Sequence, residues 1–215
     1  MPQARRGGRP SRETSEQLGA LILDAATELF LTHGFGATSI EAVAQRVRIS
    51  KRTFYHRFED KPALFAAVVH RIIERLRPST GIPLIEGADP QAMLERLAAL
   101  ILRAALSPQA IALHRMIVAE SARFPELAVV VTREGATEEA IKLIAGLLER
   151  EAKVGRLKRV ESVFAAHQFL QMVIGLPQRR AMGLGTPMSK RELTAWPRKV
   201  VDLFLNGCKV EEPTR

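Results

Sequence analysis

The chain is poor in cysteine and in long apolar runs. Cys208 is the only cysteine in 215 residues, so neither an internal disulfide nor a paired-cysteine zinc site can form. The N-terminal stretch MPQARRGGRPSRETSEQ lacks the apolar segment of a secretory signal. No run approaches the ~18–20 apolar residues needed to cross a bilayer. These absences predict a soluble protein of the reducing cytoplasm.

Patterns typical of catalysis are also scarce. There is no glycine-rich phosphate loop and no evident Ser/His/Asp or Cys/His arrangement. His114 and Glu120 lie six positions apart, off the rows of one helix face, so they make a poor metal-binding pair. We therefore expect no catalytic residues, no metal and no cofactor, and an enzyme remains the less favoured alternative.

Acidic residues are outnumbered throughout the chain. Lys and Arg total 32 against 23 Asp and Glu, a formal net charge of +9. Such a balance favours acidic partners, with nucleic acid first and an anionic membrane second. The bias is strongest from Arg46 to Phe58, where Lys and Arg occur five times and no acidic residue occurs.

Strand patterns are nearly absent. Only AVVVT at residues 128–132 resembles a strand, and we predict buried helix there because a lone strand has no partner. Gly34 has the position of a left-handed cap that ends a first helix, on which Phe35 can fold back. The sequence predicts an all-α protein. The apolar stripe of that first helix comprises Leu18, Leu21, Ile22, Ala25 and Leu29.

Residues 38–61 predict two short helices joined by a sharp turn. Thr38 and Glu41 have the spacing of a capping box for the first of them. Ser50 is a good N-cap for the second, whose inner face carries Phe54 and Phe58. The first helix is expected to bury Ile40, Val43, Ala44 and Val47.

The second of these helices has the chemistry of DNA recognition. A helix that enters the major groove turns its first residues toward base edges. Lys51 and Arg52 lie there and can donate to guanine, which gives about 1–3 kcal/mol of discrimination. Phosphate contacts hold the register. The residues predicted to contact DNA are Ser39, Ser50, Lys51, Arg52, Thr53, Tyr55, His56, Arg57 and Lys61, the last four mainly at phosphates.

The stretch SIEAVAQRVRISKRTFYHRFEDKPALF resembles the helix-turn-helix of the TetR/AcrR family of bacterial transcriptional regulators, over residues 13–76. The resemblance implies an all-helical homodimer of about nine helices per subunit, with a three-helix DNA-binding domain and a ligand-binding, dimerising body. Less specifically, HRMIVAESARFPEL at 114–127 and the pattern at 165–207 resemble the AefR-like subgroup. Such proteins usually repress, and a small molecule releases them from the operator.

The division of the chain follows from these elements. We expect a flexible basic arm at 1–12, a DNA-binding domain at 13–61 and a body at 62–215, in which 62–76 is a connecting helix. A loop rich in proline and glycine follows at 77–90. Further helices are predicted at 89–106, 107–123, 125–155, 161–182 and 189–206.

Two features depart from the family pattern. Arg48 stands in the turn where glycine is usual; a left-handed Arg48 costs on the order of 1 kcal/mol, unless the turn adopts a right-handed variant. Pro177 and Pro197 fall inside the last two predicted helices, which should therefore bend, or one should begin later.

The arm RRGGRPSR at residues 5–12 has four arginines and no acid. Its GRP core resembles an AT-hook, so Arg5, Arg6 and Arg9 are candidates for a minor groove. An ordinary basic tail is the equally acceptable alternative. Either form raises DNA affinity electrostatically.

The body carries two further sets of candidate residues. An isologous dimer interface is expected from the last two helices, because their apolar residues would otherwise leave a large exposed patch. These residues are Phe164, Leu170, Ile174, Leu193, Trp196, Val200, Leu203 and Phe204. The predicted effector pocket comprises Met93, Leu97, His114, Ile117, Glu120, Ser121, Phe169 and Met172.

The functional prediction is a sequence-specific DNA-binding regulator. We expect a homodimeric repressor that a small apolar effector releases from a palindromic double-stranded operator, with no membrane partner. The main alternative is a constitutive or architectural DNA binder without an effector. The effector, the operator and the choice between repression and activation are left open by the sequence.

Overall fold

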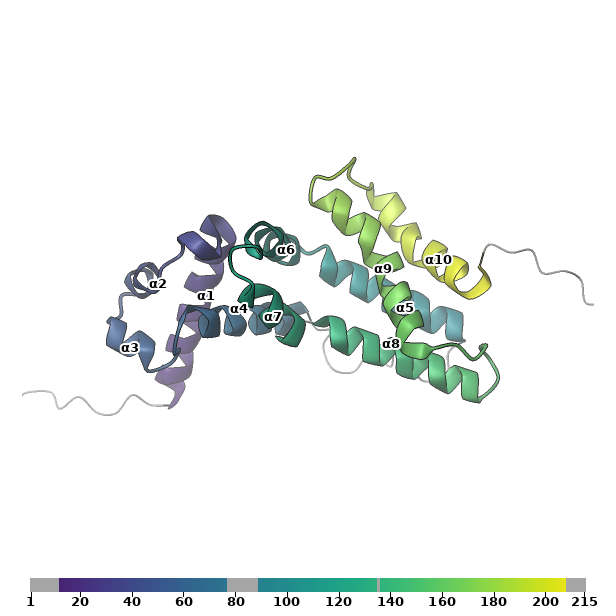
Figure 1. Ribbon diagram of the computed structural model, residues 1–215, viewed down its shortest axis with the longest axis horizontal. Coiled ribbons are helices and arrows are strands. Elements are labelled where there is room, and N and C mark those ends of the chain that lie inside the picture. The colour runs from purple at the N-terminus through teal and green to yellow at the C-terminus, as the bar shows by residue number, and fades with distance from the viewer. Residues whose placement is uncertain (1–11, 77–88, 135, 208–215) are drawn as a thin grey trace, which may run out of the picture. The chain divides into compact units, whose positions relative to one another are not determined.

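The structure is a computed structural model that describes residues 12–76, 89–134 and 136–207. Every element in these ranges is helical (Figure 1), which confirms the all-α prediction. The region after Pro125, predicted as one long helical stretch, holds two helices, and AVVVT lies in the first of them. The helices are α1 (Arg12–Ala37), α2 (Ile40–Arg46), α3 (Lys51–Tyr55), α4 (Lys61–Leu76), α5 (Pro90–Ala105), α6 (Pro108–Glu120), α7 (Glu126–Glu134), α8 (Ala136–Lys153), α9 (Ser162–Ala181) and α10 (Lys190–Asn206).

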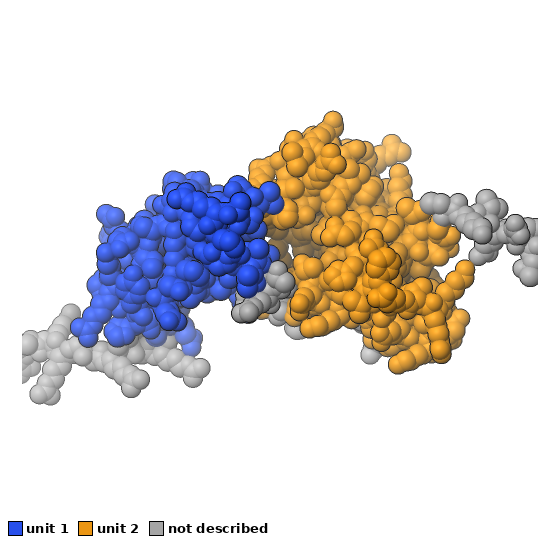
Figure 2. Space-filling view, in the orientation of Figure 1, with its two compact units in different colours: residues 1–71, 116–131 blue, residues 72–115, 132–215 orange. Residues whose placement is uncertain are grey.

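Contacts divide the chain into two compact units, coloured in Figure 2. Unit 1 comprises residues 1–71 and 116–131, and unit 2 comprises residues 72–115 and 132–215. The end of α6 and most of α7 therefore belong with the N-terminal helices, although we predicted them as part of the body.

An aromatic cluster forms the core of unit 1. Phe30 of α1 stacks on Phe35 with ring centroids 5.6 Å apart, and Phe65 of α4 meets Phe35 edge-on at 5.5 Å. All three side chains are buried. These ring contacts stabilise the packing of α1 against α4.

Gly34 interrupts α1 with φ 85° and ψ 166°, a conformation that is essentially restricted to glycine. The φ is positive, as in the predicted left-handed cap, but ψ lies outside the left-handed helical region. The predicted capping box at Thr38 was wrong, because the Thr38 hydroxyl donates to the Gly34 carbonyl oxygen at 2.8 Å and Ser39 is the cap of α2. Thr38 instead forms a hydrogen bond with the kinked residue Gly34, near the end of α1.

Residues 15–37 of α1 are long and apolar enough to cross a membrane by length and composition alone. The helix passes on average hydropathy and not as an uninterrupted apolar run, because Asp24 and Glu28 lie within it. Its apolar face is nevertheless used inside unit 1, where Ile22, Ala26 and Phe30 are completely buried. A core helix of a globular domain passes the same test.

Unit 2 is built from α5, α8, α9 and α10 around one apolar core. Both predicted interior prolines lie within helices, Pro177 in α9 and Pro197 in α10. Proline at 177 removes the N–H that would bond the Val173 carbonyl one turn earlier. The indole Nε1 of Trp196 donates to that carbonyl oxygen at 2.9 Å. Trp196 therefore ties α10 to α9 and satisfies the acceptor that proline leaves.

Candidate nucleic-acid interface

Serine residues cap the N-termini of both α2 and α3. The Ser39 hydroxyl oxygen accepts a hydrogen bond from the backbone N–H of Ala42 at 3.0 Å. The Ser50 hydroxyl oxygen accepts from the backbone N–H of Thr53 at 3.1 Å and lies 2.8 Å from the Thr53 hydroxyl. The predicted cap at Ser50 is confirmed. Each cap fixes the first turn of a short helix that would be marginal alone.

Packing on one side orients α3, which has only five residues. Phe54 is completely buried, and its ring lies 5.6 Å from that of Phe58. The opposite face is open to solvent, so the helix presents it without occlusion. The exposed residues there are Lys51, Arg52, Tyr55 and His56, all predicted to contact DNA.

Lys51 has an acidic partner that the sequence analysis did not assign. Its ammonium lies 2.5 Å from Oε1 of Glu41, in the first turn of α2. The hydrogen bond from Lys51 lowers the pKa of Glu41, and the same contact raises the pKa of Lys51. Both side chains are more than half exposed, so the pair lies on the surface at the start of α3.

The turn itself contains a left-handed arginine. Arg48 has φ 56°, and among the described residues it is the one non-glycine with positive φ. The left-handed alternative is therefore the one adopted, and Arg48 is exposed. This conformation costs an L-residue about 1–2 kcal/mol.

Arg57 and Lys61, predicted to hold phosphates, make internal contacts in unit 1. The Arg57 guanidinium donates to the carbonyl and hydroxyl oxygens of Ser15. The Lys61 ammonium donates to the Gly36 carbonyl oxygen at 3.2 Å and lies 4.4 Å from the centroid of the Phe35 ring. Burial lowers the pKa of Lys61. Arg57 and Lys61 thus connect the α3–α4 region to α1 within unit 1, a role that was not predicted.

The end of α6 contacts the last residues of α1, at and after the kink at Gly34. A carboxylate oxygen of Glu120 accepts from the backbone N–H of Gly36 at 2.6 Å. Phe124 meets Phe35 edge-on, with ring centroids 5.1 Å apart. A Cβ on Gly34 would overlap the Glu120 carboxylate, so both glycines allow close approach. The local signal was the Gly-Phe-Gly tripeptide, but its partner 84 residues away has no local signature.

The predicted minor-groove residues Arg5, Arg6 and Arg9 lie outside the described residues. The described part of the chain begins at residue 12, at the start of α1. The role of the arm therefore stays a prediction.

The predicted pocket residues are not gathered in one unit. Ile117, Glu120 and Ser121 belong to unit 1, where Glu120 is engaged by Gly36. The other five belong to unit 2. Of these, Met93, Leu97 and Phe169 are buried in the core, Met172 packs against it, and His114 is half-buried on α6.

A surface depression of about 340 Å³ lies elsewhere in unit 2, at the end of α8 and the loop before α9. None of the predicted pocket residues contributes to it. It is lined by Leu148, Glu149, Ala152, Lys153, Arg159, Val160 and Ser162.

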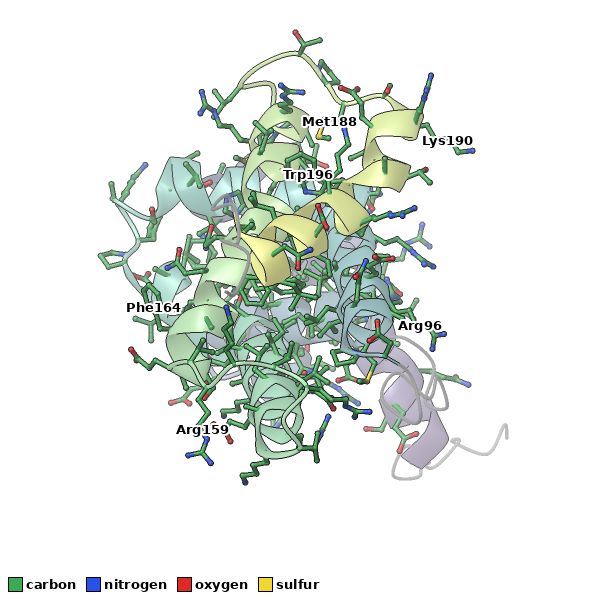
Figure 3. The ribbon with its side chains drawn as sticks, turned by 90° about the vertical axis from the view of Figure 1, so that its right-hand side faces the viewer. Arg96, Arg159, Phe164, Met188, Lys190 and Trp196 are labelled. Carbon is green, nitrogen blue, oxygen red and sulfur yellow. The ribbon has the colours of Figure 1, made fainter. Side chains whose placement is uncertain are left out.

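The predicted dimer face is partly internal. Leu170 and Val200 are 4% and 5% exposed, so they are core residues with little surface left to bury in an interface. Phe164 and Leu203 are 58% and 45% exposed and remain candidates. Figure 3 shows Phe164 directed outward from the start of α9 and Trp196 between α9 and α10. The remaining predicted residues, Ile174, Leu193, Trp196 and Phe204, are partly buried against the core of unit 2.

Two family models match the chain. Residues 22–68 match "Bacterial regulatory proteins, tetR family". Residues 92–207 match "AefR-like transcriptional repressor, C-terminal domain". The second match covers more than half of the chain, and the first contains α2, α3 and most of α1.

Solved structures resemble nearly the whole chain. The flavonoid-responsive regulator FrrA is 31% identical with a TM-score of 0.74, and the match covers 90% of this chain and 98% of that one. A structure titled as a TetR-family transcriptional regulator of Mesorhizobium loti MAFF303099 is 26% identical with a TM-score of 0.75, covering 92% and 98%.

Curated relatives match about a third of the chain. The transcriptional activator FasR of Mycolicibacterium smegmatis is 36% identical over 72 residues, 34% of this chain and 32% of that protein. The regulator UidR of Escherichia coli K12 is 37% identical over 70 residues, 30% of this chain and 36% of that protein. The matches thus span about a third of these relatives.

Proposed function

The chain belongs to the TetR family of bacterial regulatory proteins, and from this premise we propose that it is a repressor released from a palindromic operator by a small apolar effector. DNA-binding transcriptional regulation is the activity of the family. The operator, the effector and the direction of regulation are the proposed parts. The AefR-like match, described as that of a repressor domain, supports repression.

The observation that carries the proposal is the exposed face of α3. Lys51, Arg52 and Tyr55 project from a helix whose opposite side is anchored by the buried Phe54. A cation in the first turn can donate to guanine O6 and N7 in the major groove. The serine caps hold this turn before DNA arrives, which reduces the entropy lost on binding.

We propose that the protein acts as a homodimer. Two copies of α3 must reach half-sites ~34–36 Å apart, or another whole-turn spacing, which requires two subunits. The exposed apolar residues Phe164 of α9 and Leu203 of α10 support an interface formed by these helices. Such an interface would be isologous and would match the symmetry of a palindromic operator.

The effector would act by changing the distance between the DNA-binding domains of the two subunits. The connecting helix α4 is firmly attached to α1, because Arg71 donates to the Ala20 carbonyl oxygen at 2.6 Å and pairs with Asp24 at 2.9 Å. A displacement of α4 would therefore move α1 with it. By linkage, the effector must bind the DNA-free form better, typically by ~1–3 kcal/mol. The flavonoid-responsive relative supports an effector of apolar, aromatic character.

Selection of bound duplexes from a random DNA library tests the recognition assignment. The chain should enrich a palindrome, and the double variant Lys51→Ala, Tyr55→Phe should bind it at least about tenfold more weakly while folding normally. Lys142→Ala, which removes an exposed lysine of unit 2, is the matched control. Full binding by the double variant would refute the role of α3.

A release screen on the selected duplex tests the effector. A library of small aromatic and aliphatic compounds should contain molecules that dissociate the complex, and a reporter under the operator should then rise in expression. A reporter that falls when the protein is absent would establish activation in place of repression. Binding that no compound affects would favour the constitutive binder.

A further inference from the structure

Glu41 is the only acidic residue between Ser39 and Phe58, a stretch otherwise rich in Lys and Arg. It lies in the first turn of α2, one helix before the recognition helix. A carboxylate at this position is unfavourable for phosphate binding, since it repels the DNA backbone. The presence of this carboxylate beside α3 is therefore not explained by a contribution to DNA affinity.

The partner of Glu41 is a predicted base reader. Its carboxylate lies 2.5 Å from the ammonium of Lys51, and each group shifts the pKa of the other in the direction that keeps both charged. The neighbouring Arg52 has no ion-pair partner within the ranges that the structure covers. In the first turn of α3, Lys51 is therefore held by an ion pair, whereas the Arg52 side chain is not.

We propose that Glu41 is a specificity-determining residue, whose carboxylate holds Lys51 in place and withholds its charge from non-specific phosphate contacts. This inference rests on the proposed DNA recognition by α3. The ion pair is given up only where a base offers an acceptor in the right position, so Lys51 contributes at the operator and little elsewhere.

The net charge of the Glu41–Lys51 pair also separates operator binding from non-specific binding. Each phosphate that a protein neutralises adds about 0.9 to the slope of log affinity against log salt concentration. Lys51 paired with Glu41 has no net charge to offer a phosphate. Removing the carboxylate releases this cation for the backbone of any sequence.

The test compares the full chain with Glu41→Gln on two duplexes, the selected operator and a scrambled duplex of the same composition. We expect the variant to bind the scrambled duplex about tenfold more tightly, with a salt slope steeper by about 0.9, because one more cation reaches phosphate. The ratio of operator to scrambled affinity falls accordingly. Glu138→Gln is the control, since it opens another exposed Glu–Lys pair, in unit 2, and should change neither affinity.

A double-mutant cycle separates the proposed role from simple repulsion. In a Lys51→Ala background, Glu41→Gln should change the ratio by less than about twofold, because its effect passes through Lys51. An unchanged ratio for Glu41→Gln alone, or an equal change without Lys51, would overturn the inference but leave DNA recognition standing. A wild-type chain that does not distinguish the two duplexes would overturn both proposals.

Discussion

The Glu120 carboxylate accepts a hydrogen bond from the backbone N–H of Gly36 at 2.6 Å, which joins the end of α6 to the kinked end of α1. Glu120 was predicted to line an effector pocket. Its actual partner is a backbone donor of unit 1, and Lys61 donates to the carbonyl of the same glycine. The Gly34–Gly36 segment at the end of α1 is therefore held at both backbone polar groups of Gly36, by residues that are remote in sequence.

Glu120→Ala should lower the free energy of unfolding by about 1–3 kcal/mol, since the Gly36 N–H loses its acceptor. Glu120→Gln keeps an acceptor oxygen and should cost less. Hydrogen exchange at the Gly36 amide gives a local readout, and its protection should fall in the Ala variant. Glu126→Gln, at an exposed position of α7, is the control. Undiminished Gly36 protection in Glu120→Ala would contradict the assigned bond.

Arg48→Gly should stabilise the turn between α2 and α3. Relief of the left-handed backbone gains about 1–2 kcal/mol, and the greater freedom of glycine in the unfolded chain offsets about 0.4–1 kcal/mol of it. Chemical denaturation should show a small net gain. Arg48→Ala keeps the Cβ and serves as the matched variant. Equal stability of the two variants would show that strain at this position is negligible.

Trp196→Phe should destabilise unit 2 by about 1–3 kcal/mol, because the Val173 carbonyl oxygen loses its donor while Pro177 supplies none. Pro177→Ala restores a backbone N–H in the right place. The cost of Trp196→Phe should therefore be smaller in the Pro177→Ala background, and thermal or chemical unfolding of the four proteins measures this coupling. Additive effects would argue against the proposed compensation.

The pair between Glu41 and Lys51 should be visible in a pH titration. The pKa of Glu41 is lowered, so the stabilisation from the pair is complete above the ordinary glutamate pKa and is lost as pH falls through the lowered value. Carboxyl NMR shifts should place the midpoint of Glu41 below that of unpaired glutamates. Lys51→Ala should return it toward the ordinary value. A midpoint that Lys51→Ala leaves unmoved would show that the pair does not persist in solution.

Features that depend on neighbours in sequence were predictable. Helical periodicity indicated the all-α class, and α5 and α10 begin at Pro90 and Lys190, each one residue after the predicted start. The exposed face of α3 was predictable because Tyr55 lies four residues after Lys51 and therefore shares its side of the helix, where both are exposed. The one-residue error at Thr38 arose because its hydroxyl serves the kink at Gly34, a contact that cap statistics do not include.

By itself, the sequence determined the helices, the exposed face of α3 and the family, because these follow from short-range periodicity, caps and the charge of a local segment. Only the tertiary structure decided the partners of the charged and apolar groups. Glu120 meets Gly36 across 84 residues, Lys61 turns inward to a carbonyl and a ring, and Leu170 is buried in the core where an interface was expected. A helical pattern indicates that a side chain is apolar and faces inward, but which surface covers it depends on the packing of distant helices.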